Sequence, residues 1–532
     1  MKNNKILSMI AGAALLTLMP ACTNLDETVY DKLAANEFGK TKTEINALVG
    51  SVYNTLKTYW PNNFMYLSEC GGSMAVTPTR KGGDWYDGGQ YRELYMHTWT
   101  AETSQIKGSW SAASSAIGSC NAYYNVIANS PVLTEAERTM LLSEIRGVRA
   151  FWMYAMMDNW GNVPLVTEYK EERTKDDIPT VTPRQEIFEW LIKEVTEIAD
   201  SCPEPSASTY GKFTKGAAYT LLAKLYLNAE AWGVSVAGGN AYAKAIEACN
   251  KVMSMSYYIL EPDWKTNFNP NNNVSKEAIF ACTFSSQDTK NQNTMMNRTL
   301  HYKYKEVIGA SMSTWNGVCA QPDYVKLFDV EDPRYEGTFI VGQQYNKQTG
   351  EPIKTDHGFL LDHTVDVTIL PGTERDGTNW GDVNQHDGAR CQKWPYEQSL
   401  VDAMENDFHI FRLADVYLMK AEALLRSGGS VAEATNLVNQ IRSRAYGDNN
   451  HNYATVDLDK ILLERRFELA WEGHSRQDDI RFGVFEIPMW KSSNCERAKG
   501  EHLKLYPISQ DAWQTNPNLV QNPGYPAFAS GK

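Results

Sequence analysis

Two neighbouring stretches of the chain carry the periodicity of a helical hairpin, and this pattern constrains the fold more than any other feature. In residues 214–232 and 241–255, apolar side chains recur every three or four positions, and a Gly-containing turn separates the two stretches. Small residues such as Ala217 and Ala245 stand on the apolar faces, where two antiparallel helices must approach closely. This design is typical of tetratricopeptide-like repeats, in which each hairpin packs on its neighbours.

The same design returns near the C-terminus, at 413–424 and 432–441, with Ser427-Gly428-Gly429 as the turn. Apolar periodicity predicts further helices at 41–60, 104–129, 135–159 and 183–201. Residues 61–100 contain three Gly-Gly pairs among aromatic residues, which predicts loops. We therefore expect a mostly α protein built on a tetratricopeptide-like helical hairpin scaffold.

Residues 257–405 separate the hairpins and lack sustained helical periodicity. Short alternating pieces predict small strands at 280–284, 337–341 and 365–370. We expect a loop-rich, ligand-binding insertion with small β elements, because helical-repeat proteins commonly present their loops on one face for binding. The insertion divides the remaining chain into an N-terminal helical part, 22–256, and a C-terminal part, 406–532.

Residues 1–21 have the features of an export signal. Lys2 and Lys5 precede an uncharged apolar run of about 14 residues, which is shorter than the roughly 20 that span a bilayer. Cys22 follows the small Ala21, as in lipoproteins whose first mature residue is acylated, although Met19 stands where Leu is usual. We expect a lipid anchor at Cys22. Secretion with a chance cysteine is the alternative.

Net charge and cysteine spacing exclude some functions. A formal charge of −13 argues against nucleic-acid binding, which needs a surplus of Lys and Arg. The cysteines other than Cys22 form no CxxC pair and have no His at metal-ligand spacing, so we expect no bound metal and no cofactor. Their even number could permit disulfides in an oxidising exterior, but a chain of this size does not need them, and we expect mostly buried free thiols.

Recognisable catalytic motifs are absent from the sequence. No GxSxG, HExxH, Walker A or post-strand GxGxxG motif occurs. Asp478 and Asp479 are sequence neighbours and point in different directions on any regular element, so we interpret them as structural. The charged run 464–476 reads as a helix held by ion pairs, and its His474 as a hydrogen-bonded structural residue.

Aromatic loops are the candidate binding surface. Sugar rings present C–H faces that stack on Trp and Tyr, and their hydroxyls pair with planar polar side chains. The first candidate loop supplies Arg80, Asp84, Trp85, Tyr86, Asp87 and Tyr91. The insertion supplies Trp315, Asn316, Arg390, Trp394 and Tyr396. For each aromatic residue, burial in a core is the competing interpretation, and it is preferred for Trp99, Trp110 and Trp152.

Several blocks, in order along nearly the whole chain, resemble one known family. They are Cys22–Glu27, Glu144–Phe151, Trp160–Leu165, Arg412–Leu418, Ala421–Ala423, Glu464–Gly473, Asp479–Gly483, Tyr506–Ile508 and Gln521–Tyr525. Together they resemble the SusD/RagB family of nutrient-capture lipoproteins of Bacteroidetes. The insertion matches poorly, and ligand preference would reside there.

The resemblance implies a tetratricopeptide-containing scaffold, lipid-anchored at the cell surface and seated on a SusC-like TonB-dependent outer-membrane transporter. It also implies capture of an oligosaccharide or polysaccharide without hydrolysis. Some relatives bind peptides, so a peptide-capturing RagB-like protein stays open as an alternative. A secreted hydrolase and a purely structural scaffold are two further alternatives. The resemblance places binding aromatics in an early loop and in the insertion, which favours Trp85 and Trp315.

Overall fold

The computed structural model describes residues 39–170, 174–285, 293–367, 383–397, 404–487 and 497–529. The expected signal sequence, 1–21, and the expected lipidation site, Cys22, lie outside the described residues. No helix in the described ranges is both long enough and apolar enough to span a membrane.

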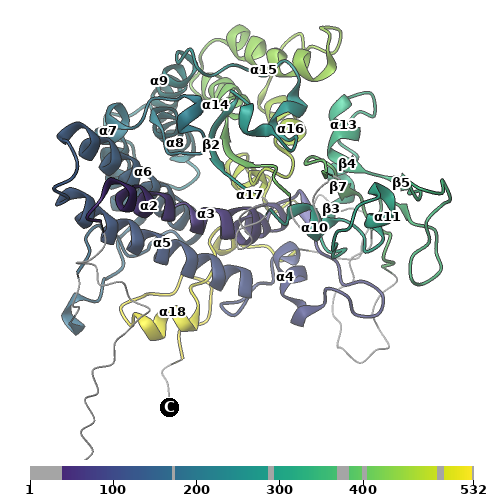
Figure 1. The fold of residues 1–532 in the computed structure, drawn as a ribbon, viewed down its shortest axis with the longest axis horizontal. Helices are drawn as coiled ribbons and strands as arrows, with labels where there is room; N and C mark the ends of the chain where they lie inside the picture. The colour runs from purple at the N-terminus through teal and green to yellow at the C-terminus, as the bar shows by residue number, and fades with distance from the viewer. Residues whose placement is uncertain are drawn as a thin grey trace, which may run out of the picture.

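Two long antiparallel helices form one side of the molecule (Figure 1). They are α5 (Ser104–Ala128) and α6 (Glu135–Trp160), where the sequence predicts helices at 104–129 and 135–159. A capping box starts α6, because the Thr134 hydroxyl accepts a hydrogen bond from the Glu137 N–H and the Glu137 carboxylate accepts one from the Thr134 N–H. Gly161, at a φ of +74°, ends the helix.

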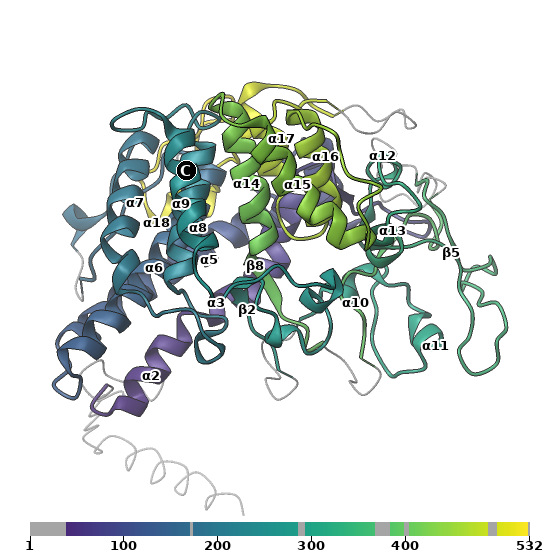
Figure 2. The same ribbon diagram turned by 90° about the horizontal axis from the view of Figure 1, so that it is seen from above.

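The predicted hairpins exist and continue this pairing of helices. They lie in the series α7 (Arg184–Ile198), α8 (Lys215–Asn228), α9 (Ala241–Met253), α14 (Leu413–Arg426), α15 (Val431–Tyr446) and α16 (Leu458–Leu469). Helix α9 packs on both α8 and α14, so the two hairpins are neighbours although the insertion separates them in sequence (Figure 2). Ala217 and Ala245 are fully buried, which permits the close approach that their size predicts. The expected mostly α fold is confirmed.

The insertion begins and ends beside the same helices, because two buried strands join its ends. Strand β2 (Ala278–Cys282) pairs antiparallel with β8 (Phe408–Arg412), with Ala281 opposite His409. The remaining strands are pairs of two-residue segments: β1 (Ala75–Val76) with β3 (Cys319–Ala320), β4 (Phe339–Ile340) with β7 (Arg390–Cys391), and β5 (Gly342–Gln343) with β6 (Asp362–His363). The strand predicted at 280–284 is thus shifted, and the one at 337–341 is shorter.

No strand forms at 365–367, and residues 368–370 of that predicted strand lie outside the described part of the chain. The insertion projects from the helical stack at the side that carries β5 and α11 (Tyr304–Ile308), as Figures 1 and 2 show.

Residues 41–100 differ from the prediction. The single helix expected at 41–60 is α2 (Lys42–Ser51) followed by α3 (Asn54–Tyr59). The chain then continues through wide helical turns at Trp60–Phe64 and Tyr66–Cys70, where loops were predicted, and α4 (Gln90–Met96) follows. The reason is burial, since these turns place Phe64 and Leu67 in the core. The turns end at Gly71, where a Cβ atom would lie 2.2 Å from the Tyr506 hydroxyl oxygen.

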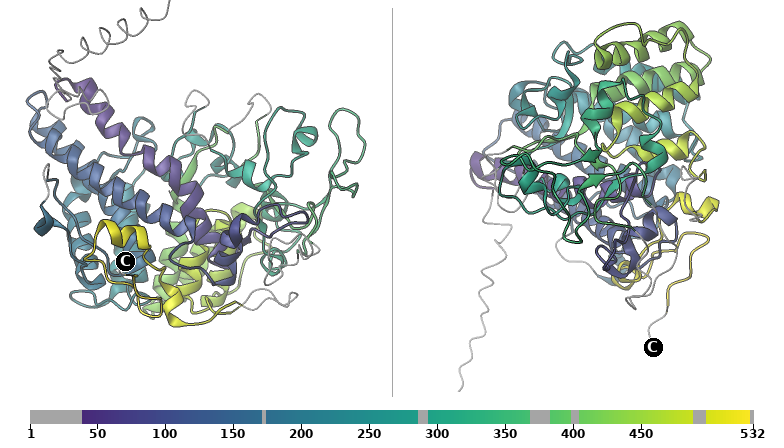
Figure 3. Two further views of the ribbon diagram at one scale, coloured as in Figure 1. Left: turned by 90° about the horizontal axis from the view of Figure 1, so that it is seen from below. Right: turned by 90° about the vertical axis from the view of Figure 1, so that its right-hand side faces the viewer.

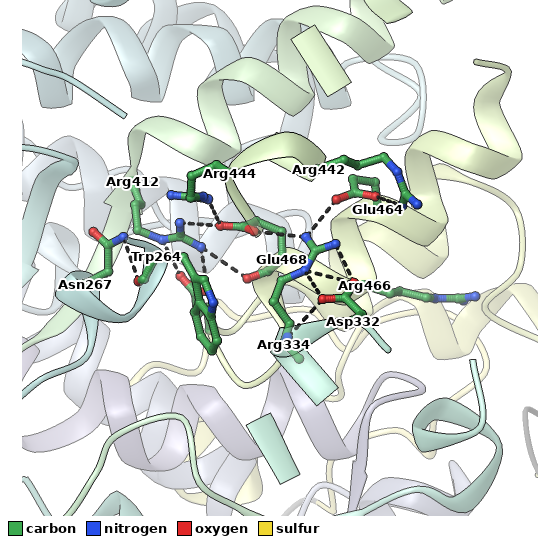
Figure 4. Close-up of polar contacts among 12 residues, drawn as sticks. Trp264, Asn267, Asp332, Arg334, Arg412, Arg442, Arg444, Glu464, Arg466 and Glu468 are labelled. Carbon is green, nitrogen blue, oxygen red and sulfur yellow. Dashed lines mark hydrogen bonds and ion pairs between the residues drawn. The ribbon is translucent and has the colours of Figure 1, made fainter. Parts of the chain in front are cut away.

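Buried ion pairs fasten the insertion to α16 (Figure 4). Arg334 of the insertion donates to Glu464 (2.7 Å) and Glu468 (3.1 Å), and Glu468 also accepts from Arg412 (2.7 Å). Lys393, also in the insertion, donates to Glu472 over 2.6 Å. The charged run 464–476 is therefore laced with ion pairs, as predicted, but it is not a single helix, because α16 ends at Leu469 and α17 (Ser475–Arg481) begins at Ser475. However, these glutamates pair with other elements rather than along their own helix. Removing one partner from such a network leaves an uncompensated buried charge.

Candidate functional site

Backbone strain singles out two loops. Of six non-glycine residues with positive φ in the described ranges, three are Trp85 (+61°), Asp87 (+41°) and Asn316 (+56°). They lie in residues 80–89, the Trp85 loop, and in residues 313–318, the Trp315 segment. Strained conformations persist only where the surroundings hold them, and they cluster at functional sites. The Trp85 loop and the Trp315 segment are therefore the candidate functional site.

Arg80 ties the loops together from inside. Its fully buried guanidinium donates to the carbonyl oxygens of Asn316, Asn384 and Asp387, each over 2.9 Å. Burial lowers the pKa of Arg80. Burial and the nearby Arg80 charge lower the pKa of Arg390 to about 9, and Arg390 donates to the Asn316 side-chain oxygen over 2.8 Å.

Arg80, Asn316 and Arg390 are fully buried, so their predicted role as ligand contacts needs correction. Each is committed to contacts within the protein, and a ligand at the surface cannot reach them. Their effect is to position the Trp85 loop and the Trp315 segment.

Five side chains form a closed circuit where the loops meet, and we call them the aromatic cluster: Tyr66, Trp85, Tyr91, Arg298 and Trp315. Trp85 donates its indole N–H to the Trp315 carbonyl oxygen over 2.5 Å and meets Tyr91 edge-on at 5.1 Å between ring centroids. Tyr91 lies 5.1 Å from Tyr66. The Arg298 guanidinium lies 5.5 Å from the Tyr66 ring centre and 5.4 Å from a ring centre of Trp315. Tyr66 is buried, and the other four are partly exposed.

Gly317 makes room for the Trp85 ring. A Cβ atom at position 317 would lie 2.5 Å from two carbon atoms of that ring. The ring is thus held by a hydrogen bond at its nitrogen and by close packing on the main chain of the Trp315 segment. Such fixed aromatic faces suit stacking on a sugar ring without an ordering cost at binding.

Tyr86 and Asp87 complete the exposed side of the Trp85 loop. Tyr86 is half-buried and Asp87 is exposed, so both remain accessible to a ligand. In the same loop, Asp84 accepts a hydrogen bond from the Tyr302 hydroxyl over 3.3 Å. Carboxylates beside aromatic faces supply the hydrogen-bonding groups that sugar hydroxyls need.

Trp394 and Tyr396 pack against the hydrophobic core. Trp394 is 1% exposed and stacks on Phe408 with centroids 5.5 Å apart, so it belongs to the core and its predicted ligand role is wrong. Tyr396 is half-buried against the same core. Trp99, Trp110 and Trp152 are buried, as predicted.

The groups considered for catalysis are structural. Asp478 accepts from Arg465 (2.8 Å) and Arg481 (2.7 Å), and Asp479 accepts from Arg466 (3.0 Å). His474 is buried, and burial lowers its pKa to about 4, so it is neutral at pH 7. The ion pairs of Asp478 and Asp479 agree with the structural interpretation of the acidic pair, and the hydrogen-bonded structural role of His474 stays a prediction.

In the described ranges, no group of three or more His, Cys, Asp or Glu residues is placed to hold a metal ion. The cysteines there are buried free thiols, as predicted: Cys70, Cys120, Cys202, Cys249, Cys282, Cys319 and Cys391.

A groove of about 610 Å³ lies between α5 and α18 (Gln510–Thr515). The left view of Figure 3 shows the yellow C-terminal helix on the face seen from below. The walls of the groove include Ile117, Met156 and Leu519, and its one aromatic lining residue, Trp110, is buried. The groove lacks the exposed ring faces and paired polar groups that distinguish the aromatic cluster, so it is the weaker candidate for a sugar.

Sequence reasoning missed Tyr66 and Arg298. Tyr66 lies in a segment that was predicted as a loop but forms helical turns, and Arg298 carries no local signal in a stretch without periodicity. Nothing in the sequence shows that these two residues meet Trp85 and Trp315 in space.

The fold and the cluster together define a class: a helical-repeat scaffold that presents aromatic loops for binding. Two family models match the chain, "SusD family" over residues 276–525 and "Starch-binding associating with outer membrane" over residues 25–227. The protein belongs to the SusD/RagB family.

Relatives agree with this assignment. The starch-binding protein SusD of Bacteroides thetaiotaomicron is 26% identical over 433 residues, which cover 74% of each chain. A SusD-like protein of Bacteroides ovatus is 23% identical over 475 residues, covering 88% of this chain and 80% of the relative.

Solved structures share the fold. A laminarin-binding SusD-like protein superposes with a TM-score of 0.71 at 21% identity, covering 91% of this chain and all of the other. Surface glycan-binding protein A of Bacteroides uniformis gives 0.71 at 19% identity, with 91% and 99% covered.

Proposed function

We propose that this protein is a surface lipoprotein that binds oligosaccharide or polysaccharide at the aromatic cluster and delivers it to a SusC-like TonB-dependent transporter. The observation that carries the proposal is the fixed geometry of Trp85 and Trp315. One hydrogen bond to the Trp315 carbonyl and a glycine that accommodates the Trp85 ring hold the partly exposed Trp85 side chain against the Trp315 segment. Family membership supports it, since relatives bear names such as starch-binding and laminarin-binding.

Within this site, the aromatic faces of Trp85, Tyr91 and Trp315 stack on sugar rings, while Tyr86 and Asp87 lie at the accessible rim. The partly exposed Arg298 guanidinium can donate to hydroxyl oxygens. The ligand is held and not cleaved, because the cluster contains no pair of opposed carboxylates of the kind that glycosidases use. The relatives' names, which describe binding proteins, agree with this role.

Delivery requires attachment to the outer membrane, which we assign to acylated Cys22. The sequence before Cys22 supports this anchor, and one matching family model is described as associating with the outer membrane. Metabolic labelling with palmitate tests it. The wild-type protein should carry label and sediment with outer membranes, whereas Cys22→Ser should lose both properties. An unlabelled wild-type protein in the medium would contradict the anchor.

The transporter contact has a separate test. We expect a tagged protein, solubilised from outer membranes, to retain a TonB-dependent transporter of the SusC type. Recovery of the protein alone, with the membrane fraction intact, would contradict this partner.

Affinity electrophoresis tests the ligand class. The purified protein should be retarded in gels that contain starch, laminarin or another polysaccharide of a panel, and Trp85→Ala should move freely. Binding of peptides with no retardation by any glycan would replace the sugar by a peptide ligand. Release of reducing sugar from the polysaccharides would instead indicate a hydrolase.

A further inference from the structure

The insertion places a second exposed aromatic ring beside the Trp85 loop. Phe359 is 44% exposed, at the end of a turn in which the Gly358 N–H donates to the Thr355 carbonyl and the Thr355 N–H donates to the Phe359 carbonyl. Gly358, at a φ of +84°, permits this turn. The ring is therefore carried by a hydrogen-bonded hairpin, at the projecting side of the molecule where β5 and α11 lie (Figures 1 and 2).

Phe359 is in contact with the Trp85 loop. The Lys81 ammonium lies 5.9 Å from the Phe359 ring centre, and the His386 ring lies 5.7 Å away on another segment. The Lys81 N–H donates to the Val383 carbonyl over 2.8 Å, which fixes this edge of the loop. Lys81, which lies four positions before Trp85 in sequence, thus connects Phe359 to the Trp85 loop.

Tyr302 and Lys303 join the same two segments. The Tyr302 hydroxyl donates to Asp84 of the Trp85 loop over 3.3 Å, while the Lys303 ammonium pairs with Asp356 of the Phe359 turn over 3.0 Å. Tyr302 is half-buried, so part of its ring is accessible. The Trp85 loop therefore contacts the aromatic cluster through Trp85, and contacts Tyr302 and Phe359 through Asp84 and Lys81.

We propose that Phe359 and Tyr302, with Lys81 as a hydrogen-bond donor, form a second sugar subsite, so that the ligand is a chain that crosses the Trp85 loop. This inference rests on the proposed function. Its ingredients repeat those of the first site: accessible ring faces, a cation and carboxylates that pair with hydroxyls. A short ligand fills one subsite only, and a long one reaches both.

The test compares ligand lengths. Titration calorimetry would measure the affinity for a disaccharide and a heptasaccharide of the maltose and laminaribiose series, with wild-type protein and Phe359→Ala. We expect Phe359→Ala to weaken heptasaccharide binding about tenfold, which is about 1.4 kcal/mol, and to leave disaccharide binding within about twofold. Trp85→Ala should weaken both ligands. Tyr345→Ala is the matched control, because Tyr345 is a 54% exposed aromatic residue of the same hairpin and pairs with Pro352.

The possible outcomes test the second subsite and the proposed function separately. Equal affinities of wild type and Phe359→Ala for the heptasaccharide, or equal losses for both lengths, would overturn the second subsite while the proposed function stands. If Tyr345→Ala weakens the heptasaccharide as much as Phe359→Ala does, the specific role of Phe359 is likewise overturned. Failure of the wild-type protein to bind any glycan of the polysaccharide panel would contradict the proposed function itself. An unchanged unfolding temperature of Phe359→Ala shows that a loss of binding is local.

Discussion

The indole N–H of Trp85 donates to the main-chain carbonyl oxygen of Trp315 over 2.5 Å, and this bond joins two loops that are 230 positions apart in sequence. It fixes the relative position of the two tryptophans that we place at the centre of the glycan site. Because Arg80 fastens the same two loops from inside, the site is built before a ligand arrives. Preorganisation of this kind reduces the ordering cost of binding.

Two substitutions of Trp85 distinguish the contribution of its hydrogen bond to glycan affinity from that of its aromatic ring. Trp85→Phe keeps an aromatic face but removes the donor to Trp315, so we expect glycan affinity to fall by about 1 kcal/mol, the net value of one hydrogen bond. Trp85→Ala also removes stacking, for which about 1–3 kcal/mol is the range known for bases on aromatic side chains. Calorimetric titration measures both. Trp513→Phe is the control, since Trp513 stacks on Phe528 in the C-terminal segment. Equal affinities of wild type and Trp85→Ala would remove Trp85 from the site.

Gly317 offers a test that leaves every binding side chain in place. Gly317→Ala introduces a Cβ atom about where the Trp85 ring packs, so the ring must move and glycan affinity should fall at least fivefold. The matched control is Gly118→Ala on α5, where a Cβ atom has no neighbour within 4 Å and where alanine should stabilise the helix by up to about 1 kcal/mol. Binding by Gly317→Ala at wild-type strength would show that the ring position is unimportant.

Glu468 anchors the insertion to the scaffold, and its charge is expected to dominate the stability of that contact. Glu468→Gln leaves Arg334 and Arg412 short of a buried counter-charge, so the free energy of unfolding should fall by about 3–5 kcal/mol. Denaturant unfolding measures this change. Glu102→Gln breaks the ion pair with Lys107 at a residue whose side chain is 60% exposed, and should change stability by less than about 1 kcal/mol. Similar effects of the two substitutions would contradict the role of the buried network.

Glu69 makes the free energy of unfolding depend on pH. Burial raises the pKa of Glu69 from 4.5 to about 8, and the Gly473 and His474 N–H groups donate to one of its carboxyl oxygens. Between about pH 4.5 and about pH 8, the Glu69 carboxyl group is therefore protonated in the folded state and ionised in the unfolded state. The resulting stability is full below about pH 4.5 and is lost as the pH rises towards 8.

Glu69→Gln removes this titration and keeps an acceptor oxygen. Relative to wild type, its free energy of unfolding should increase by a few kcal/mol between about pH 5 and about pH 8, as each unit of pKa shift corresponds to about 1.4 kcal/mol. Denaturant unfolding of both proteins at several pH values measures the difference. A difference that stays constant with pH would contradict the assignment to Glu69.

The helical scaffold could be predicted from the sequence because its signal is local. The roles of the alanines of α8 and α9 and of the capping residues of α6 depend on neighbours within one or two helical turns in sequence. The wide turns at 60–70 were missed because Pro61 and the Gly71-Gly72 pair suggest a loop, whereas burial of Phe64 and Leu67 depends on helices far away in sequence.

The site could be predicted only in part, because contacts between distant segments decide exposure. Trp85 and Trp394 both stand in loop-rich sequence, yet one ring is partly exposed and the other lies in the core. Arg80 and Arg390 have the residue type of a ligand contact, but both are fully buried and donate to main-chain carbonyls or to the Asn316 side chain. Arg298 and Phe359 gain their importance from neighbours that local sequence does not identify.

The most direct measurement is a crystal structure of the protein with an oligosaccharide that retards it in affinity gels. The account predicts sugar rings stacked on Trp85 and Trp315, with hydroxyl groups near Tyr86, Asp87 or Arg298. A sugar bound in the groove between α5 and α18, with the aromatic cluster empty, would contradict it.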